Sequence, residues 1–314
     1  MSDSKAPAPV APKKKPAYLQ YLFGGSAGMG ATVFVQPLDL VKTRLQISGQ
    51  GGTAKEYTGM FDAFTKIAKR EGVRALYKGL SAGLLRQATY TTTRLGTYTF
   101  LNDTYKSKTG KQANLFVSMG LGVAAGVTGS FVGNPAEISL IRMTADGKLP
   151  LNQRRNYTSV VNAISRMVRE EGVLTLWRGC IPTMGRAAVV NAAQLSSYSQ
   201  AKRILINNGM QEGISLHFVA SMISGLVTTI ASMPVDIAKT RIQNMKIGPD
   251  GSAEYKGAID VLTKVCRQEG VFALWKGFWP YYFRLGPHTV ITFIFMEQMN
   301  ELYNRMTGTG GSSF

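Results

Sequence analysis

The chain has 314 residues, of which 45% are hydrophobic and 17% are charged, and its formal net charge is +18. Its two cysteines, Cys180 and Cys266, are too few for a disulfide framework or a cysteine-rich metal site, and we interpret both as small apolar packing residues. The positive charge is typical of proteins that bind nucleic acids or anionic membranes, and composition alone leaves both classes open.

Residues 1–17 are rich in Pro, Ala and Lys. They contain neither the apolar stretch of a secretory signal nor the arginine-containing amphipathic pattern of a transit peptide. We therefore predict a disordered tail over 1–17 and a second one over 307–314, which is rich in Gly and Ser.

Between these tails the chain alternates between long apolar segments and polar links. Each apolar segment is longer than the roughly 20 residues that cross a bilayer as a helix. Closely spaced glycines in several of them allow membrane helices to pack against one another. The six predicted spans are 21–46, 80–105, 115–144, 181–206, 216–243 and 278–303. Long basic links, each with a short amphipathic helix, follow the first, third and fifth spans.

Two motifs recur along the chain with one period. The first reads PLDLVKTR, PAEISLIR and PVDIAKTR, with its prolines at Pro37, Pro135 and Pro234, at steps of 98 and 99 residues. The second reads EGVRALYKG, EGVLTLWRG and EGVFALWKG, at steps of 100 and 98 residues. Such periodicity predicts three repeats, 18–108, 109–208 and 209–306. We expect an all-α membrane protein whose six spans form a pseudo-threefold barrel, with both termini on the side opposite the long basic links.

A membrane barrel accounts for the positive charge without a nucleic-acid partner, because the chain has no basic platform studded with aromatic residues. It also has no nucleotide-binding loop, metal-ligand cluster or catalytic Ser/His/Asp set. We therefore expect neither an enzyme nor a cofactor or bound metal.

Charged residues occur inside the predicted spans. Asp39 and Lys42, like Asp236 and Lys239, are three residues apart and share a helix face. A charge that faces lipid at the middle of a span costs roughly 2.5–3.5 kcal/mol. We therefore expect these groups to face a polar axis, where the acid of one helix contacts the base of the next and closes one end of a cavity. A permanent clamp between helices is the alternative.

An arginine stands nine residues after the aromatic residue of each [YW]-[KR]-G sequence, at Arg86, Arg186 and Arg284. Arginine keeps its charge in proteins, and its planar fork suits bidentate binding of carboxylates. Three such groups at one level predict a site for a small anion with two or more acidic groups. The alternative is that each arginine pairs with an internal acid, although few unassigned acids lie within the spans.

Departures from the repeat provide selectivity. Arg86, Tyr90 and Arg94 have the spacing of one helix face. Tyr90 and Gln194 can hydrogen-bond a hydroxyl or keto oxygen of a ligand. His288 follows Pro287 and is either a ligand-binding residue or a packed or gating residue.

The pattern P-x-[DE]-x-x-[KR]-x-[KR], repeated three times, resembles the mitochondrial carrier family over about residues 20–305. The resemblance implies a monomeric six-helix barrel in the inner mitochondrial membrane that works by alternating access. It also implies that the long links lie on the matrix side, so that the termini face the intermembrane space. Anionic lipid of that membrane, including cardiolipin, is the expected lipid partner.

In that family, acids and bases pair around the matrix end of the barrel. Carried over, Glu137 pairs with Lys239 and Asp236 with Lys42, whereas the base expected opposite Asp39 is replaced by a leucine. Glutamines brace these pairs in the family. The residues at the brace positions here are Gln46, Thr144 and Gln243, so the resemblance implies two bridges and two braces.

The gate at the other end is weaker. The family pattern [FY]-[DE]-x-x-[KR] reads YTFLN, YSQAK and MEQMN in this chain. It keeps charge only at Glu297 and Lys202, which can hydrogen-bond Asn102 and Thr99 respectively. The resemblance therefore implies a cytosolic gate that is held more loosely than the matrix gate.

Five stretches resemble dicarboxylate exchangers within this family, at residues 79–96, 141–150, 176–184, 191–200 and 232–245. They imply electroneutral exchange of 2-oxoglutarate for malate or a related dicarboxylate. They also imply that Arg94 and Gln194 lie above the arginine level. Dicarboxylate/phosphate exchange, proton leak and a scaffold that has lost transport remain alternatives.

Overall fold

The computed structural model describes residues 17–50, 56–149, 154–211, 213–245 and 253–307. These residues form six long membrane-spanning segments, as predicted. The spans are α1 (Ala17–Ile47), α3 to α4 (Leu80–Thr109), α5 (Leu115–Ala145), α7 (Cys180–Asn207), α8 (Ile214–Asn244) and α10 (Phe278–Thr307). The predicted tails, 1–17 and 307–314, lie outside the described residues except for Ala17 and Thr307, which are helical.

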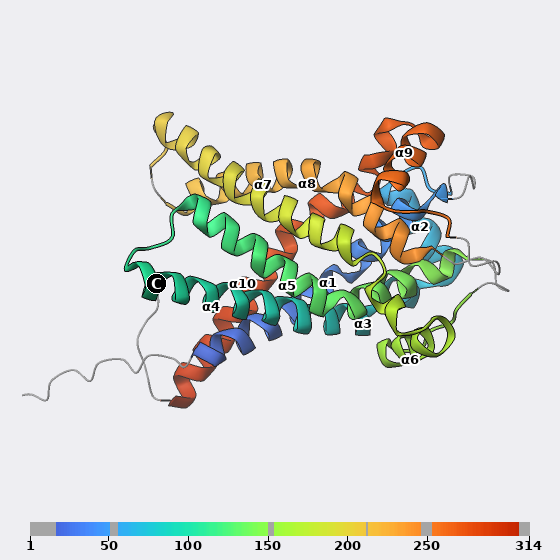
Figure 1. Ribbon diagram of the computed structural model, residues 1–314, viewed down its shortest axis with the longest axis horizontal. Coiled ribbons are helices and arrows are strands. Elements are labelled where there is room, and N and C mark those ends of the chain that lie inside the picture. Colours follow the sequence, from blue (N-terminus) through green and yellow to red (C-terminus); the bar gives the residue numbers. More distant parts are fainter. Residues whose placement is uncertain (1–16, 51–55, 150–153, 212, 246–252, 308–314) are drawn as a thin grey trace, which may run out of the picture.

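The spans pack as three pairs (Figure 1): α4 with α5, α7 with α8, and α1 with α10. The pairing of α1 with α10 brings the first and last spans together and closes the ring. A proline lies inside each of α1, α5 and α8. Proline removes a helical hydrogen bond and favours a kink, so the repeat places the same potential bend in each of these three spans.

The second span departs from a regular α-helix. It consists of α3 (Leu80–Arg86), a π-helical turn at Gln87–Thr91 (η3) and α4 (Thr92–Thr109). The wider π turn changes the direction of the side chains that follow it, so the spacing of one α-helical face does not extend across it.

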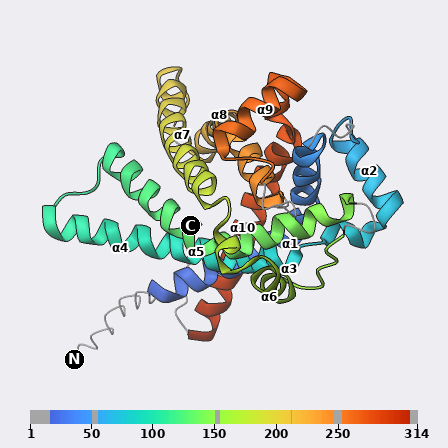
Figure 2. The same cartoon turned by 45° about the vertical axis from the view of Figure 1, so that its right-hand side comes forward.

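Three short amphipathic helices, α2 (Met60–Glu71), α6 (Val160–Glu171) and α9 (Ala258–Glu269), lie at one end of the molecule (Figures 1 and 2). Each buries one apolar face against the spans. Each ends at a glycine with positive φ, at Gly72, Gly172 and Gly270, before a 3-10 turn. The glycine of the EG motif is therefore explained by the backbone conformation that this turn requires.

The last base of each proline motif is a buried arginine. Arg44, Arg142 and Arg241 are 0%, 0% and 1% exposed. Each binds the glutamate of the EG motif in its own repeat: Arg44 to Glu71 at 2.9 Å, Arg142 to Glu171, and Arg241 to Glu269 at 2.5 Å. The same guanidinium also donates from Nε to a backbone carbonyl of another repeat, at Thr144, Gln243 and Gln46 respectively. These contacts attach each amphipathic helix to its span and join the repeats in a ring.

Large apolar side chains cover the outside of the spans, among them Phe34, Phe116 and Phe218. Buried arginines inside and exposed phenylalanines outside are the arrangement that lipid favours. Among the described residues, Leu115–Lys148 and Ser215–Asn244 combine the length of a span with mean hydropathies of 1.8 and 1.7.

Candidate functional site

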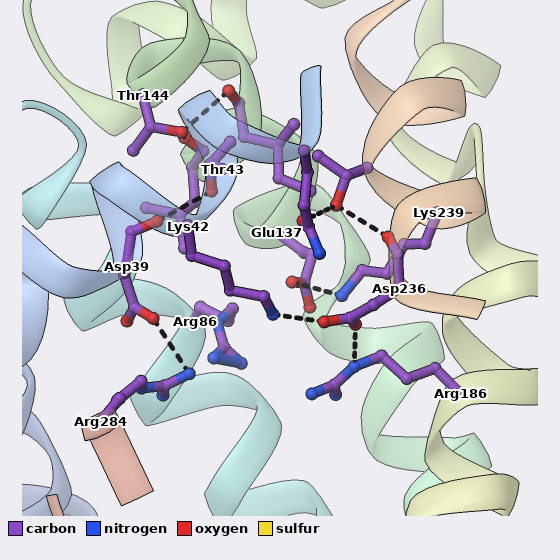
Figure 3. Close-up of a pocket in the computed structure, with 14 residues that line it drawn as sticks. Asp39, Lys42, Thr43, Arg86, Glu137, Thr144, Arg186, Asp236, Lys239 and Arg284 are labelled. Atoms are coloured by element: carbon purple, nitrogen blue, oxygen red, sulfur yellow. Dashed lines mark hydrogen bonds and ion pairs between the residues drawn. The ribbon is translucent and has the colours of Figure 1, made fainter. Parts of the chain in front are cut away.

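The predicted charged axis exists as a cavity of about 50 Å³, whose lining side chains are drawn in Figure 3. Three carboxylates and five cationic groups line it, a formal excess of two positive charges. These groups are Asp39, Glu137, Asp236, Lys42, Lys239, Arg86, Arg186 and Arg284. A doubly negative anion is the ligand that would neutralise this cavity.

Both predicted ion pairs of the closed end are present. Lys239 Nζ lies 2.6 Å from Glu137 Oε1, and Lys42 contacts Asp236. Both pairs are almost fully buried and join different repeats. The motif therefore holds the ends of α1, α5 and α8 together.

The third acid has a partner that the motif does not predict. The base position opposite Asp39 is Leu140, and no bridge forms there. Asp39 Oδ1 instead lies 3.0 Å from Arg284 Nη1, so α1 is connected to α10 (Figure 3).

All three predicted arginines line the cavity, but the expectation that they are unpaired is wrong for two of them. Arg284 binds Asp39, and Arg186 binds Asp236. The sequence interpretation missed these two ion pairs because it assigned the acids to the closed end alone. The same acids are also within reach of the arginines on neighbouring helices. Arg86 forms no ion pair or hydrogen bond among the described residues and stands in the middle of the group (Figure 3).

The predicted glutamine braces are also wrong in detail. Gln46 Oε1 accepts a 2.8 Å hydrogen bond from Thr240, and Gln243 Nε2 donates to Asn134 and Thr183 at 3.3 and 3.2 Å. In the described structure neither amide hydrogen-bonds a side chain of these ion pairs. The threonine and asparagine side chains are closer partners, and the spacing of the motif gave no signal for them.

Arg94 and Gln194 line a second, larger cavity of about 610 Å³ between α4, α5, α7 and α8. There Arg94 donates a 2.9 Å hydrogen bond to Asn191 Oδ1. The predicted single face of Arg86, Tyr90 and Arg94 is interrupted by the π turn, and Arg86 and Arg94 line different cavities. Tyr90 packs so closely on α5 that a Cβ at Gly133 would lie 3.1 Å from its own Cβ.

His288 stays an open candidate, because its Nε2 is buried without a hydrogen-bond partner among the described residues. Tyr281 was missed by sequence reasoning. Its hydroxyl group lies 2.9 Å from Arg186 Nη2, and its ring lies 4.1 Å from Lys42 Nζ. An aromatic residue three positions before Arg284 is the only signal that the sequence offered.

The hydrogen bonds expected at the opposite gate, of Glu297 with Asn102 and of Thr99 with Lys202, stay predictions. Ion pairs draw the spans together at one end, whereas the other ends lie apart as three pairs (Figure 1). The described state is closed at the end that carries the amphipathic helices.

Comparison with known proteins agrees with this architecture. The sequence model of the mitochondrial carrier protein family matches residues 13–109, 111–209 and 211–307. The chain is 63% identical over 300 residues to the mitochondrial 2-oxoglutarate/malate carrier protein of Homo sapiens, with 95% of each chain covered. It is 65% identical over 289 residues to the protein of the same name from Caenorhabditis elegans, covering 92% of this chain and 94% of that one.

A more distant relative carries a different name. The mitochondrial uncoupling protein 4 of Arabidopsis thaliana is 41% identical over 309 residues, covering 90% of this chain and 97% of that one.

Proposed function

Because the chain belongs to the mitochondrial carrier family, we propose that it exchanges 2-oxoglutarate for malate or a related dicarboxylate across the inner mitochondrial membrane. The observation that carries this proposal is identity of 63–65% with carriers of that name over almost the whole chain. The cavity with two excess positive charges agrees with it.

The arginine level provides the binding chemistry. Arg86 offers a guanidinium group that has no ion pair within the described part of the chain, and Arg186 and Arg284 offer two more within the same cavity. Each can bind one carboxylate through two parallel hydrogen bonds. A dicarboxylate neutralises the cavity's formal excess of two positive charges. One-for-one exchange of two dicarboxylates moves equal charge in both directions, so it is electroneutral.

Alternating access would open this site first to one side of the membrane and then to the other. The ion pairs around Asp236 and Glu137 form the matrix gate in the proposal, with Gln46 and Gln243 beside them. Thr99, Asn102, Lys202 and Glu297 would meet at the cytosolic gate when the other end closes. A ligand shifts such an equilibrium only by its difference in affinity for the two states.

Selectivity is assigned to the residues that differ between repeats. Tyr90, Arg94, Gln194 and His288 would contact the part of the substrate between or beyond its carboxylates. The exposed phenylalanines support contact with the acyl chains of inner-membrane lipid. Anionic lipid, including cardiolipin, is part of the proposal. The proposal also includes three repeats, at 18–108, 109–208 and 209–306, and termini that face the intermembrane space. It further includes function as a monomer without a nucleic-acid partner.

Reconstituted liposomes test it. Vesicles loaded with malate should take up labelled 2-oxoglutarate, and empty vesicles should not. Substitution of Arg186 by Ala should abolish uptake and leave a folded protein, and unchanged exchange would contradict the site. A panel of unlabelled dicarboxylates, phosphate and nucleotides then defines the substrate class.

The strongest second candidate is a related carrier activity, either dicarboxylate/phosphate exchange or proton leak. The similarity to an uncoupling protein supports this second candidate. Phosphate is also an anion that an arginine cluster can bind. Inhibition by phosphate equal to that by malate, or proton flux without substrate, would favour it. A scaffold that has lost transport is disfavoured by the intact arginine level.

A further inference from the structure

One tyrosine next to the cavity connects all three repeats. Tyr281 lies on α10, in the third repeat, and is 6% exposed. Its hydroxyl oxygen accepts a 2.9 Å hydrogen bond from Arg186 Nη2 on α7, in the second repeat. Its ring centroid lies 4.1 Å from Lys42 Nζ on α1, in the first repeat. Tyr281 therefore contacts two of the cations that line the cavity.

The other two repeats have no equivalent of this tyrosine. Three residues before the arginine, the matching positions hold Gly83 and Thr183. Glycine has no side chain, and the hydroxyl group of Thr183 accepts a hydrogen bond from Gln243. The tyrosine contact is therefore a feature of the third repeat, and it is directed at Arg186.

The protein holds two of the three guanidinium nitrogens of Arg186. Nε contacts Asp236, and Nη2 donates to Tyr281. Nη1 forms no hydrogen bond or ion pair in the described part of the chain, and the guanidinium group points into the cavity (Figure 3). Nη1 and one N–H of Nη2 remain for a ligand, because a guanidinium group has five N–H donors.

Two contacts fix the direction of this group better than one. A single contact at Nε leaves the planar guanidinium group free to pivot, whereas a second contact at Nη2 fixes its plane. An arginine that is free to move must be immobilised when a ligand binds, and a side chain already held in its bound conformation avoids that cost. A carboxylate that enters the cavity thus meets donors of Arg186 whose direction is already set.

We infer that Tyr281 is a positioning residue for the substrate, because it orients Arg186 so that the remaining N–H groups receive one carboxylate of the dicarboxylate. The inference rests on the proposed function, since it takes the dicarboxylate as the ligand of Arg186. It assigns substrate affinity to the hydroxyl group of Tyr281 and packing against Lys42 to its ring. Tyr281 acts through Arg186 and not by touching the substrate.

Tyr281→Phe separates these two roles, because it removes the hydroxyl group and keeps the ring beside Lys42. Immobilising one rotamer-rich side chain lowers affinity by a factor of about 2 to 12, so KM for 2-oxoglutarate should rise within that range, by about fivefold. The change should fall on KM rather than on kcat, as for any interaction that contributes to binding alone. KM for malate should rise by the same factor, because both substrates present a carboxylate to Arg186.

Thermal unfolding without substrate tests whether the hydroxyl group is merely structural. The side chain of Arg186 is 21% exposed, so water can replace the hydroxyl group as a partner of Nη2 without fixing its direction. Tyr281→Phe should therefore lower the unfolding temperature less than Tyr281→Leu, which also removes the ring from Lys42.

The neighbouring tyrosine provides the matched control. Tyr282 stacks on Phe278, and its hydroxyl group forms no hydrogen bond within the described part of the chain. Tyr282→Phe removes the same atom one position along α10 and should leave both KM values and the unfolding temperature near those of the unsubstituted protein.

The experiment uses the full chain in liposomes, with labelled 2-oxoglutarate against internal malate and labelled malate against internal 2-oxoglutarate. A KM for Tyr281→Phe less than twofold above that of the unsubstituted protein overturns the inference. A rise for one substrate alone also overturns it, because that result indicates direct recognition of a group in which the substrates differ. So does a fall in unfolding temperature as large as that of Tyr281→Leu. If Tyr281→Leu does not fold, the two KM values of Tyr281→Phe decide.

Failure of the inference and failure of the proposed function give different results. If the unsubstituted protein exchanges neither substrate, the proposed function is refuted and the inference falls with it. If the unsubstituted protein exchanges both and Tyr281→Phe does so with the same KM values, only the inference is refuted.

Discussion

Replacing Glu269 by Gln is expected to be among the most destabilising single changes in the chain. The carboxylate is 7% exposed and bridges Arg241, which is 1% exposed, and Lys276. Its removal takes the carboxylate away from the buried guanidinium group of Arg241, in a site that water scarcely reaches, and also removes one contact of Lys276. Removal of one partner of a buried ion pair costs about 3–5 kcal/mol.

A surface ion pair in the same kind of helix provides the control. Asp62 is 28% exposed and pairs with Lys66 four residues on, at 2.9 Å. Such pairs contribute about 0.3–0.5 kcal/mol. Asp62→Asn should therefore cost roughly a tenth of what Glu269→Gln costs, although both substitutions remove one carboxylate from an amphipathic helix.

The assay is thermal unfolding of the purified protein, followed with a maleimide dye that becomes fluorescent when it reacts with Cys180 and Cys266 as these thiols become accessible. Near-UV circular dichroism provides a readout independent of cysteine. A midpoint for Glu269→Gln that is no lower than the midpoint for Asp62→Asn would refute the buried-bridge argument.

Lowering the pH should weaken the stabilising contribution of the same carboxylate, that of Glu269. Burial alone would raise the pKa of Glu269, but hydrogen bonds from Arg241 and Lys276 outweigh it and hold the pKa below the ordinary value of 4.5. The carboxylate therefore stabilises the fold fully above that value, and its contribution is lost as pH falls through the lower folded-state pKa. Glu269→Gln should show a smaller loss of stability between neutral pH and pH values below 4.5 than the unsubstituted protein.

Two further predictions concern the wall between the second and third spans and the larger cavity. Gly129→Ala should lower the free energy of unfolding by about 1–3 kcal/mol, because a Cβ there would lie 3.1 Å from the backbone oxygen of Tyr90. The control Gly185→Ala should be tolerated, since a Cβ at that position has nothing within 4 Å. Equal unfolding temperatures for the two variants would contradict this packing. Asn191→Ala removes the amide oxygen that orients Arg94. Because a hydrogen bond to a charged group contributes about 1.5–3 kcal/mol, KM for 2-oxoglutarate should rise about tenfold or more with the fold intact. A KM within twofold of the unsubstituted value would show that this contact plays no part in substrate binding.

Sequence periodicity was sufficient for the architecture. The steps between prolines and between EG motifs indicated the repeats, and apolar length indicated the spans, because both signals are local properties of the chain. The partners in the two pairs Lys42–Asp236 and Lys239–Glu137 came from the family resemblance, which was carried over onto the matching motif positions.

Contacts that break the symmetry could not be predicted in this way. Whether Arg284 reaches Asp39 depends on the tilt of two spans and on the length of both side chains, neither of which is encoded in a spacing. The π turn at Gln87–Thr91 likewise moved Arg94 away from the face that α-helical counting assigned to it.

The sequence by itself determined that three equivalent helix pairs surround a positively charged axis, because period, apolar length and motif are written residue by residue. Only the tertiary structure decided which end is closed and which cations are already occupied. Those outcomes are set by distances between side chains from different repeats, and burial makes such distances decisive, since a charge inside the barrel must take the nearest opposite charge that the fold brings within reach.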